Sequence, residues 1–86
     1  MTFEFDPLKS AANKQKHGID FVEAQQLWGD GDLVELPSRD PKEERYLMIG
    51  MMEDRHWTAI VTYRSENIRI ISVRRARVKE VEIYDR

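Results

Sequence analysis

The chain has 86 residues, no cysteine and a formal net charge of −2 at pH 7. This length predicts a single domain, residues 1–86, with a modest core, and the lack of cysteine excludes a disulfide framework, a thiolate nucleophile and a cysteine-ligated zinc site. No run approaches the ~20 apolar residues of a membrane span, and the opening MTFEFDP lacks the basic flank and apolar core of a signal peptide, so we expect a cytoplasmic protein.

The small net charge conceals a strong segregation of charge along the chain. Residues 20–54 hold ten acids and three bases, whereas residues 64–79 hold six bases and one acid. Local potential, rather than net charge, governs what a surface attracts. The basic segment therefore indicates an anionic ligand, and pairing with the chain's own acids is the alternative interpretation.

The first predicted elements are a short strand at residues 3–5 and a helix at residues 8–17. Asp6 is a good N-cap, and Pro7 fits the first helical position because its missing N–H costs nothing there. Gly18 is well placed to end this helix. The helical periodicity predicts a buried side made of Leu8, Ala11 and Ala12.

A second helix is predicted to begin immediately afterwards. Asp20, followed three residues later by Glu23, fits a capping box, and Gly29 ends the pattern. Apolar residues at spacings of three and four predict an amphipathic helix with a buried side made of Phe21, Ala24, Leu27 and Trp28.

Beyond Gly31 the hydrophobic period changes to that of strands. Residues 37–44 are polar with two prolines and are predicted to form an exposed loop. The β-branched and aromatic content predicts strands at residues 32–36, 45–52, 57–64 and 67–75. Short polar connectors favour an antiparallel arrangement, and a helix at residues 76–84 closes the chain. The expected fold class is α+β, with two N-terminal helices packed on an antiparallel sheet of three to four strands and a C-terminal helix.

The predicted strand at residues 67–75 carries several arginines between its apolar residues. The planar guanidinium suits bidentate contacts to phosphate, so a cluster of arginines is typical of nucleic-acid binding. Strict alternation puts Arg69 and Arg75 on one face and Arg74 on the other. We therefore expect that these cations cannot all reach one ligand.

A candidate catalytic face is predicted on the first helix. Spacings of four, seven and eight residues bring together Lys9, Asn13, Lys16 and His17. Histidine is the usual proton shuttle near neutral pH, and RNA supplies its own nucleophile, the 2′-hydroxyl. A ribonuclease then needs a base, an acid and cations around the phosphate, but no metal. Compensation of the helix dipole by basic residues before Gly18 is the alternative interpretation.

Two further features complete the candidate chemistry. Glu43, Glu44 and Arg45 lie where the polar loop enters a strand, so a carboxylate there can act as a general base, orient the arginine or be an ordinary surface acid. The two histidines, His17 and His56, are far apart in the sequence, so no metal site is expected.

The order of these motifs resembles that of the BrnT family, ribonuclease toxins of bacterial type II toxin–antitoxin pairs. The matching segments are FEFDPLKSAANKQKHGIDFVEA (3–24), EERYLMIG (43–50), Tyr63-Arg64 and RIISVRRARVKEVEIY (69–84). Four motifs in the same order over most of the chain make the resemblance specific.

The resemblance implies a RelE-like fold with a curved antiparallel sheet and metal-independent cleavage of RNA without a cofactor. It also implies growth arrest by the free toxin and neutralisation by a BrnA-type antitoxin in a hetero-oligomer, with operator DNA bound only through the antitoxin. A non-catalytic or degenerate RelE-like protein-binding module in an autoregulatory complex is the alternative.

Site residues follow from the resemblance as a hypothesis. Either Glu44 or His17 is the base, and the other or Lys16 is the acid. The residues expected to hold the phosphate are Arg45, Arg64 and Arg74. The residues expected to bind RNA around the site are Lys9, Arg69, Arg75 and Arg77.

Overall fold

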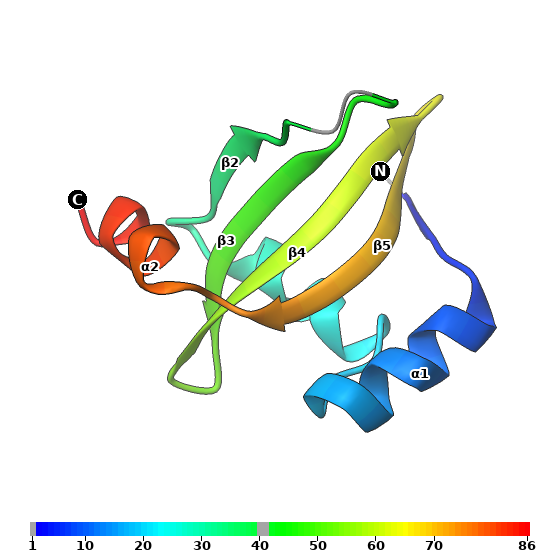
Figure 1. The fold of residues 1–86 in the computed structure, drawn as a ribbon, viewed down its shortest axis with the longest axis horizontal. Coiled ribbons are helices and arrows are strands. Elements are labelled where there is room, and N and C mark those ends of the chain that lie inside the picture. Colours follow the sequence, from blue (N-terminus) through cyan, green and yellow to red (C-terminus); the bar gives the residue numbers. More distant parts are fainter. Residues whose placement is uncertain (1, 40–41) are drawn as a thin grey trace.

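A computed structural model describes residues 2–39 and 42–86 (Figure 1). Its elements, in chain order, are β1 (Thr2–Glu4), α1 (Pro7–His17), the 3₁₀ helix η1 (Glu23–Gly29), β2 (Val34–Pro37), β3 (Tyr46–Met52), β4 (Arg55–Arg64), β5 (Asn67–Arg75) and α2 (Val78–Tyr84). The five strands form one sheet in the order β1-β5-β4-β3-β2. Asp40 and Pro41, in the predicted loop, lie outside the described residues.

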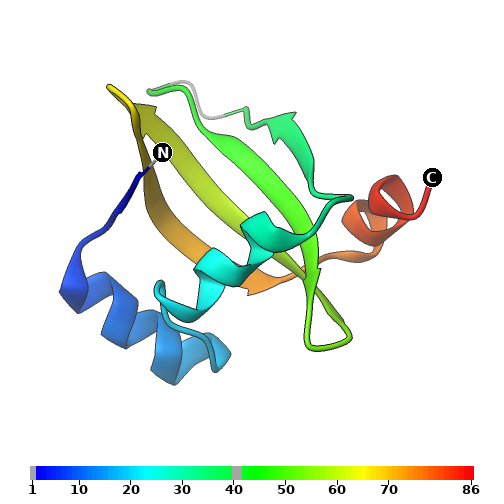
Figure 2. The ribbon, with the colours of Figure 1, turned by 180° about the vertical axis from the view of Figure 1, so that it is seen from behind.

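The layers of the fold are a single twisted sheet and helices on both of its faces. η1 lies across one face, which we call the covered face, and α1 lies beside β5 at the edge of the sheet (Figure 2). The opposite face, which we call the open face, carries α2 at one end (Figure 1). Within the described ranges, none of the helices is long and apolar enough to cross a membrane.

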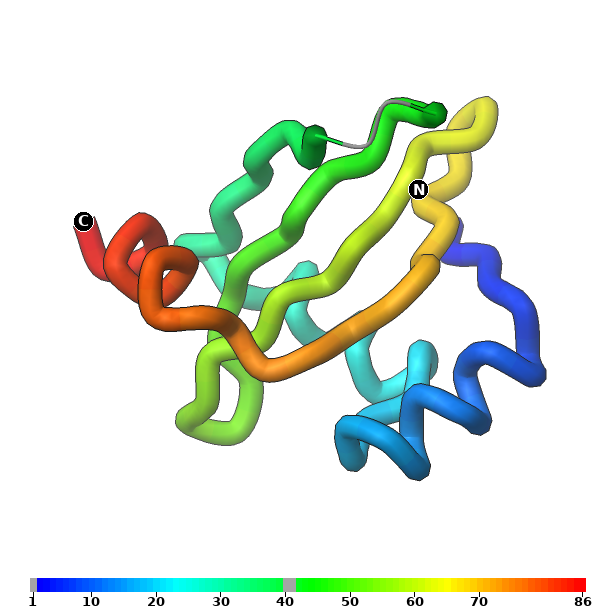
Figure 3. The backbone as a smooth tube through the Cα atoms, in the orientation of Figure 1, coloured from blue at the N-terminus to red at the C-terminus, as the bar shows by residue number. Residues whose placement is uncertain are grey.

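The expected fold class is wrong in its helices and in its sheet. One α-helix, not two, precedes the sheet, and the sheet has five strands of mixed direction. The mixed direction arises because β1 pairs in parallel with β5, with Phe3 opposite Ile68, and Figure 3 shows the N-terminal segment running beside that strand. A three-residue strand carries no local signal for a partner more than sixty residues away.

The second predicted helix is a 3₁₀ helix that begins at Glu23, three residues after the predicted start at Asp20, although the predicted reciprocal hydrogen bonds of Asp20 and Glu23 form. Asp20 Oδ1 accepts a hydrogen bond from the backbone N of Glu23 at 2.7 Å, and Glu23 Oε1 accepts one from the backbone N of Asp20 at 3.0 Å. Ala24 and Leu27 are fully buried and three residues apart, so they lie on one side of a helix with three residues per turn. Spacing of three fits both helix types, so the sequence does not distinguish them.

The predicted buried side of α1 is wrong. Leu8 is 81 % exposed, whereas Ser10 and Asn13 are buried. The helix packs by hydrogen bonds: Ser10 Oγ accepts from the backbone N of Phe21 at 2.9 Å. Polar side chains therefore face the core and apolar ones face solvent.

Asn13 closes an edge of the sheet. Its Nδ2 donates to the carbonyl oxygens of Ile19 at 2.8 Å and Val73 at 2.9 Å, and its Oδ1 accepts from the backbone N of Val73 at 3.2 Å. β1 pairs with β5 only at residues 67–69, so the edge of β5 beyond them needs another partner. The Asn13 amide replaces a neighbouring strand there.

We expect Asn13→Ala to lower the free energy of unfolding by about 2–3 kcal/mol, because buried backbone groups of Val73 and Ile19 lose their partners. Urea unfolding followed by tryptophan fluorescence measures the change. Gln15→Ala, an exposed site on the same helix, is the matched control. Equal stability of the two variants would contradict the role of Asn13 at the strand edge.

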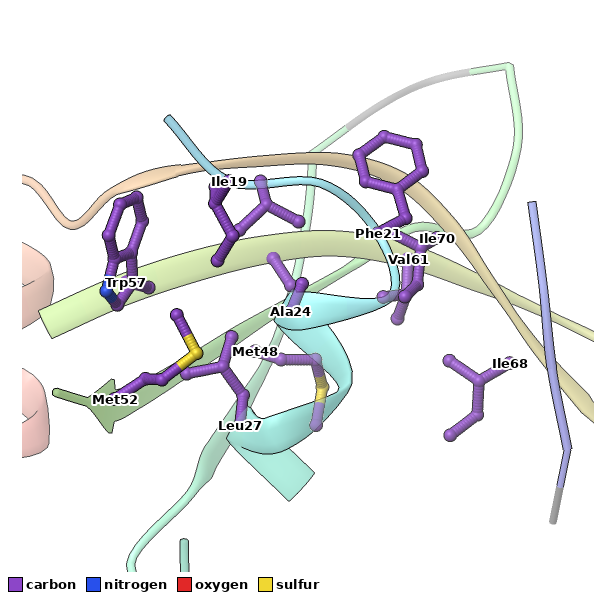
Figure 4. Packing of buried hydrophobic residues seen from close by; sticks show 12 residues of the cluster. Ile19, Phe21, Ala24, Leu27, Met48, Met52, Trp57, Val61, Ile68 and Ile70 are labelled. Atoms are coloured by element: carbon purple, nitrogen blue, oxygen red, sulfur yellow. The ribbon is translucent and has the colours of Figure 1, made fainter. Parts of the chain in front are cut away.

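The core lies between the covered face of the sheet and η1 (Figure 4). Its buried members come from the 19–27 segment and from three central strands: Ile19, Phe21, Ala24, Leu27, Met48, Met52, Trp57, Ala59, Val61, Ile68, Ile70 and Val73. Phe3 and Trp28 pack against this cluster, with ring centroids 4.9 Å apart. The buried side chains of this core therefore lie on the side of the sheet opposite the open face.

A β-bulge interrupts the alternation of β5. Ile60 pairs with Ser72, but the next residue, Val61, pairs with Ile70. Ile71 is therefore the additional residue in β5. The alternation of side chains between the two faces shifts by one residue across it.

The bulge overturns the predicted division of the arginines. Arg69 lies opposite Thr62, and Arg74 lies opposite Thr58, on the same face of regular β4. Arg75 lies opposite Trp57 on the covered face. Arg69 and Arg74 thus share the open face, and Arg75 does not, contrary to strict alternation.

Candidate functional site

A polar hollow of about 520 Å³ lies on the open face. It is lined by one residue of α1, two residues that precede β3, and residues of β4 and β5: Lys9, Glu43, Arg45, Thr62, Arg64, Arg69 and Ile71. We call it the basic hollow, because its lining has four cations and one acid. All four cations belong to the residues predicted from the sequence to act on RNA.

The strands place the floor of the basic hollow. Thr62 and Arg69 are opposite each other on β4 and β5, and Arg64 follows Thr62 by two residues, so it projects from the same face. Ile71, the bulged residue, also lines the hollow. The bulge therefore helps to shape the site.

Partly exposed ion pairs hold three of the cations. Arg45 Nε lies 2.7 Å from Glu43 Oε1. Arg64 Nε and an Arg69 amino nitrogen lie 3.8 Å and 3.6 Å from the same oxygen, Glu4 Oε1. The side chains of Arg45, Arg64 and Arg69 are 34, 62 and 32 % exposed, so each is accessible to an incoming anion.

The acid in the hollow is Glu43. Glu43 and Arg45 both precede β3 and make an ion pair, so their side chains lie together. The side chain of Glu44 is exposed, and its backbone oxygen accepts a hydrogen bond from Thr62 Oγ1 at 2.8 Å. The structure therefore places Glu43, and not Glu44, among the lining residues.

Lys16 and His17 are at the far end of α1. His17 follows Lys9 by eight residues, which is about 12 Å along the helix axis. Lys16 is exposed, and His17 is half-buried. Neither lines the basic hollow.

Arg74 is engaged with α2. Its two amino nitrogens lie 2.8 Å and 2.9 Å from the two carboxylate oxygens of Glu80, and the Arg74 side chain is 18 % exposed. Glu80 also accepts hydrogen bonds from Thr58 Oγ1 at 2.9 Å and from the backbone N of Arg77 at 2.8 Å. The Arg74 guanidinium, more than these donors, lowers the pKa of Glu80 to about 2. The pair fastens α2 to the sheet.

Arg75 and Arg77 are also outside the hollow. The Arg75 guanidinium lies 5.5 Å from the ring centroid of Trp57, a cation–π contact on the covered face. Arg77 is exposed at the start of α2.

A second group of polar contacts anchors the end of α2. Tyr84 donates its hydroxyl to Asp30 Oδ2 at 2.7 Å, and the same oxygen accepts from the backbone N of Met51 at 2.8 Å. The hydrogen bond to Asp30 raises the pKa of Tyr84 to about 12. His56 Nε2 lies 3.3 Å from Asp85 Oδ1 nearby. These contacts join the C-terminal end of α2 to Asp30 and to β4.

Sequence reasoning did not identify Glu4 as part of the site. Its neighbours Phe3 and Phe5 pack against the core, so alternation turns Glu4 toward the open face. The aromatic-Glu-aromatic pattern was the signal that could have revealed it. Arg69 lies directly opposite Glu4 in the β1–β5 register. The contact between them could not be predicted without knowing that these two strands pair.

Comparison with known proteins gives one family. A family model described as "Ribonuclease toxin, BrnT, of type II toxin-antitoxin system" matches residues 5–80. No curated protein shows significant sequence similarity to the chain. The matched range contains every residue that lines the basic hollow.

Proposed function

The chain belongs to the BrnT family of ribonuclease toxins of type II toxin–antitoxin systems, and from this premise we propose that it is a metal-independent endoribonuclease that cleaves RNA in the basic hollow. The observation that carries this proposal is the convergence of Lys9, Arg45, Arg64 and Arg69 in one hollow. These residues come from segments far apart in the sequence and meet beside the carboxylate of Glu43, with Glu4 contacting Arg64 and Arg69. Guanidinium groups suit the paired oxygens of a phosphate, and four cations exceed the charge of one phosphodiester.

The proposed reaction is attack of the RNA 2′-hydroxyl on the adjacent phosphorus. Glu43 takes the hydroxyl proton, and Lys9 gives a proton to the departing 5′-oxygen. Arg64 and Arg69 bind the non-bridging oxygens, whose negative charge increases in the transition state. Arg45 orients Glu43 through their ion pair. The bond from phosphorus to the 5′-oxygen breaks, and a 2′,3′-cyclic phosphate remains.

The other predicted roles stay predictions. The alternative acid–base set consists of Glu44, His17 and Lys16. These residues can act only if the bound RNA extends beyond the hollow, because none of them lines it. Arg74 reaches a phosphate only if its pair with Glu80 opens. Arg75 and Arg77 contact RNA only along such an extended path.

The membership of a type II family implies an antitoxin partner. We propose that this partner is of the BrnA type, that it neutralises the toxin in a hetero-oligomer, and that the complex reaches operator DNA through the antitoxin. The free toxin then arrests growth by cleaving RNA in the cytoplasm. A cation-rich hollow provides the surface that an antitoxin must cover or distort to prevent cleavage.

We expect the purified chain, freed from antitoxin, to cleave RNA in EDTA and to produce 2′,3′-cyclic phosphate ends. Glu43→Gln is expected to lower the cleavage rate by about 10²–10⁴-fold, the usual range for the loss of a general base. Glu44→Gln, the same change one residue along, is the matched control and is expected to retain most of the activity. End analysis of labelled RNA and single-turnover rates provide the measurements.

Each other outcome has a distinct meaning. A greater loss in Glu44→Gln than in Glu43→Gln would reassign the base to Glu44. Cleavage only after addition of a divalent cation would overturn metal independence. Absence of cleavage under both conditions, with antitoxin binding intact, would favour the non-catalytic binding module.

A further inference from the structure

We propose that Glu4 is a positioning residue that competes with RNA phosphate for Arg64 and Arg69 and so limits the affinity of the basic hollow. This inference rests on the proposed function, because it assumes that the hollow binds RNA. Glu4 precedes the segment matched by the family model. Its role is inferred from its contacts in the structure.

Glu4 lies between the two arginines. β1 and β5 pair in register with Glu4 opposite Arg69, so the two side chains are cross-strand neighbours on the open face. Arg64 reaches the same carboxylate oxygen from the end of β4. The other oxygen accepts a hydrogen bond from Asn67 Nδ2 at 3.3 Å. The carboxylate is thus held by β5 and not by the arginines alone.

The distances leave the arginine donors available. Glu4 Oε1 is 3.8 Å from Arg64 Nε and 3.6 Å from the Arg69 amino nitrogen, both beyond ordinary hydrogen-bond length. The carboxylate therefore reduces the repulsion between two neighbouring cations without occupying their donors fully. It keeps both guanidinium groups at the hollow.

The same charge opposes an incoming phosphate. A phosphodiester bound by Arg64 and Arg69 meets the negative charge of Glu4, which is 32 % exposed, at short range. RNA must offset this repulsion and weaken the existing ion pairs before it binds. In the free protein, Glu4 consequently cancels part of the positive charge that RNA would otherwise neutralise.

We expect Glu4→Gln to bind RNA about two- to five-fold more tightly at moderate salt, which corresponds to a weak exposed ion pair. The glutamine oxygen retains the hydrogen bond from Asn67, so the fold is preserved. The slope of log affinity against log salt is expected to become steeper by about 0.7, the value for one more neutralised phosphate on a single strand. Fluorescence anisotropy with a 2′-O-methylated RNA, which lacks the nucleophile, measures both quantities.

Two matched variants separate this role from a general effect of charge. Glu66→Gln makes the same change in an exposed residue of the turn after Arg64 and is expected to leave the slope nearly unchanged. In an Arg69→Gln background, the gain from Glu4→Gln is expected to fall by more than half.

The outcomes distinguish this inference from the proposed function. Unchanged or weaker RNA binding by Glu4→Gln, or an equal effect of Glu66→Gln, would overturn the role of Glu4 while RNA binding by the wild type still stands. Failure of the wild-type chain to bind RNA would instead overturn the use of the hollow for RNA, and with it the role of Glu4.

Discussion

Replacement of Arg74 by alanine is expected to lower the free energy of unfolding by about 3–5 kcal/mol at neutral pH, because a buried carboxylate loses its counter-ion. Arg74 and Glu80 form two hydrogen bonds, and their side chains are only 18 and 10 % exposed. Without Arg74, the Glu80 carboxylate keeps only its hydrogen bonds from Thr58 and the backbone N of Arg77, which do not neutralise its charge. Urea unfolding measures the loss, with Lys79→Ala, at an exposed position of α2, as the control.

The cost of Arg74→Ala is also expected to depend on pH. Folding lowers the pKa of Glu80 from its ordinary 4.5 to about 2, chiefly through Arg74. A lowered carboxyl pKa adds stability that is complete above 4.5 and is lost as the pH falls toward 2. This shift corresponds to about 3 kcal/mol. The difference between wild type and Arg74→Ala should therefore shrink between pH 4.5 and 2, and a constant difference would contradict the assigned pair.

A double variant separates the structural and catalytic roles of Arg74. Arg74→Met with Glu80→Gln removes both charges and is expected to recover most of the lost stability, because a buried pair contributes little beyond neutral packing. If this double variant cleaves RNA at the wild-type rate, the role of Arg74 is to hold α2. If it is stable but inactive, Arg74 acts on RNA after its pair with Glu80 opens.

Local sequence signals predicted contacts between chain neighbours but not the partners of distant segments. The capping box of Asp20 and Glu23 forms as predicted, because its two residues are neighbours in the chain. The parallel pairing of Phe3 with Ile68 joins distant segments, so no periodicity reveals it. The exposed position of Leu8 has a similar cause, since hydrogen bonds of Asn13 to Val73, sixty residues away, determine which side of α1 is buried.

The candidate site shows the same division. All four cations that line the hollow were among the residues predicted to act on RNA, because each lies in a recognisable segment. The bulge at Ile71 decided which arginines share a face, and strict alternation cannot predict an additional residue. Glu43 lies in a bend before β3, so no periodicity of the sequence distinguishes it from Glu44 as the acid of the hollow.

A large loss of activity is expected when Arg64 and Arg69 are both replaced by glutamine. Removal of a single transition-state donor commonly costs about 10²–10³-fold in rate, so we expect at least this loss in single-turnover cleavage of RNA. Stability should change by less than ~1 kcal/mol, because both ion pairs are long and partly exposed. The variant thus tests chemistry in a protein that remains folded.

The control for this double variant must remove the same charge outside the hollow. Arg55 and Arg86 are exposed and do not line it, so Arg55→Gln with Arg86→Gln isolates the effect of net charge on RNA attraction. A modest rise in KM with an unchanged maximal rate is expected of this control, since long-range attraction affects encounter more than chemistry. Equal losses in the two double variants would show that the cations act by general attraction alone. A loss confined to the variant at Arg64 and Arg69 would show that the location of these two cations in the hollow, and not the total charge of the chain, determines the rate of cleavage.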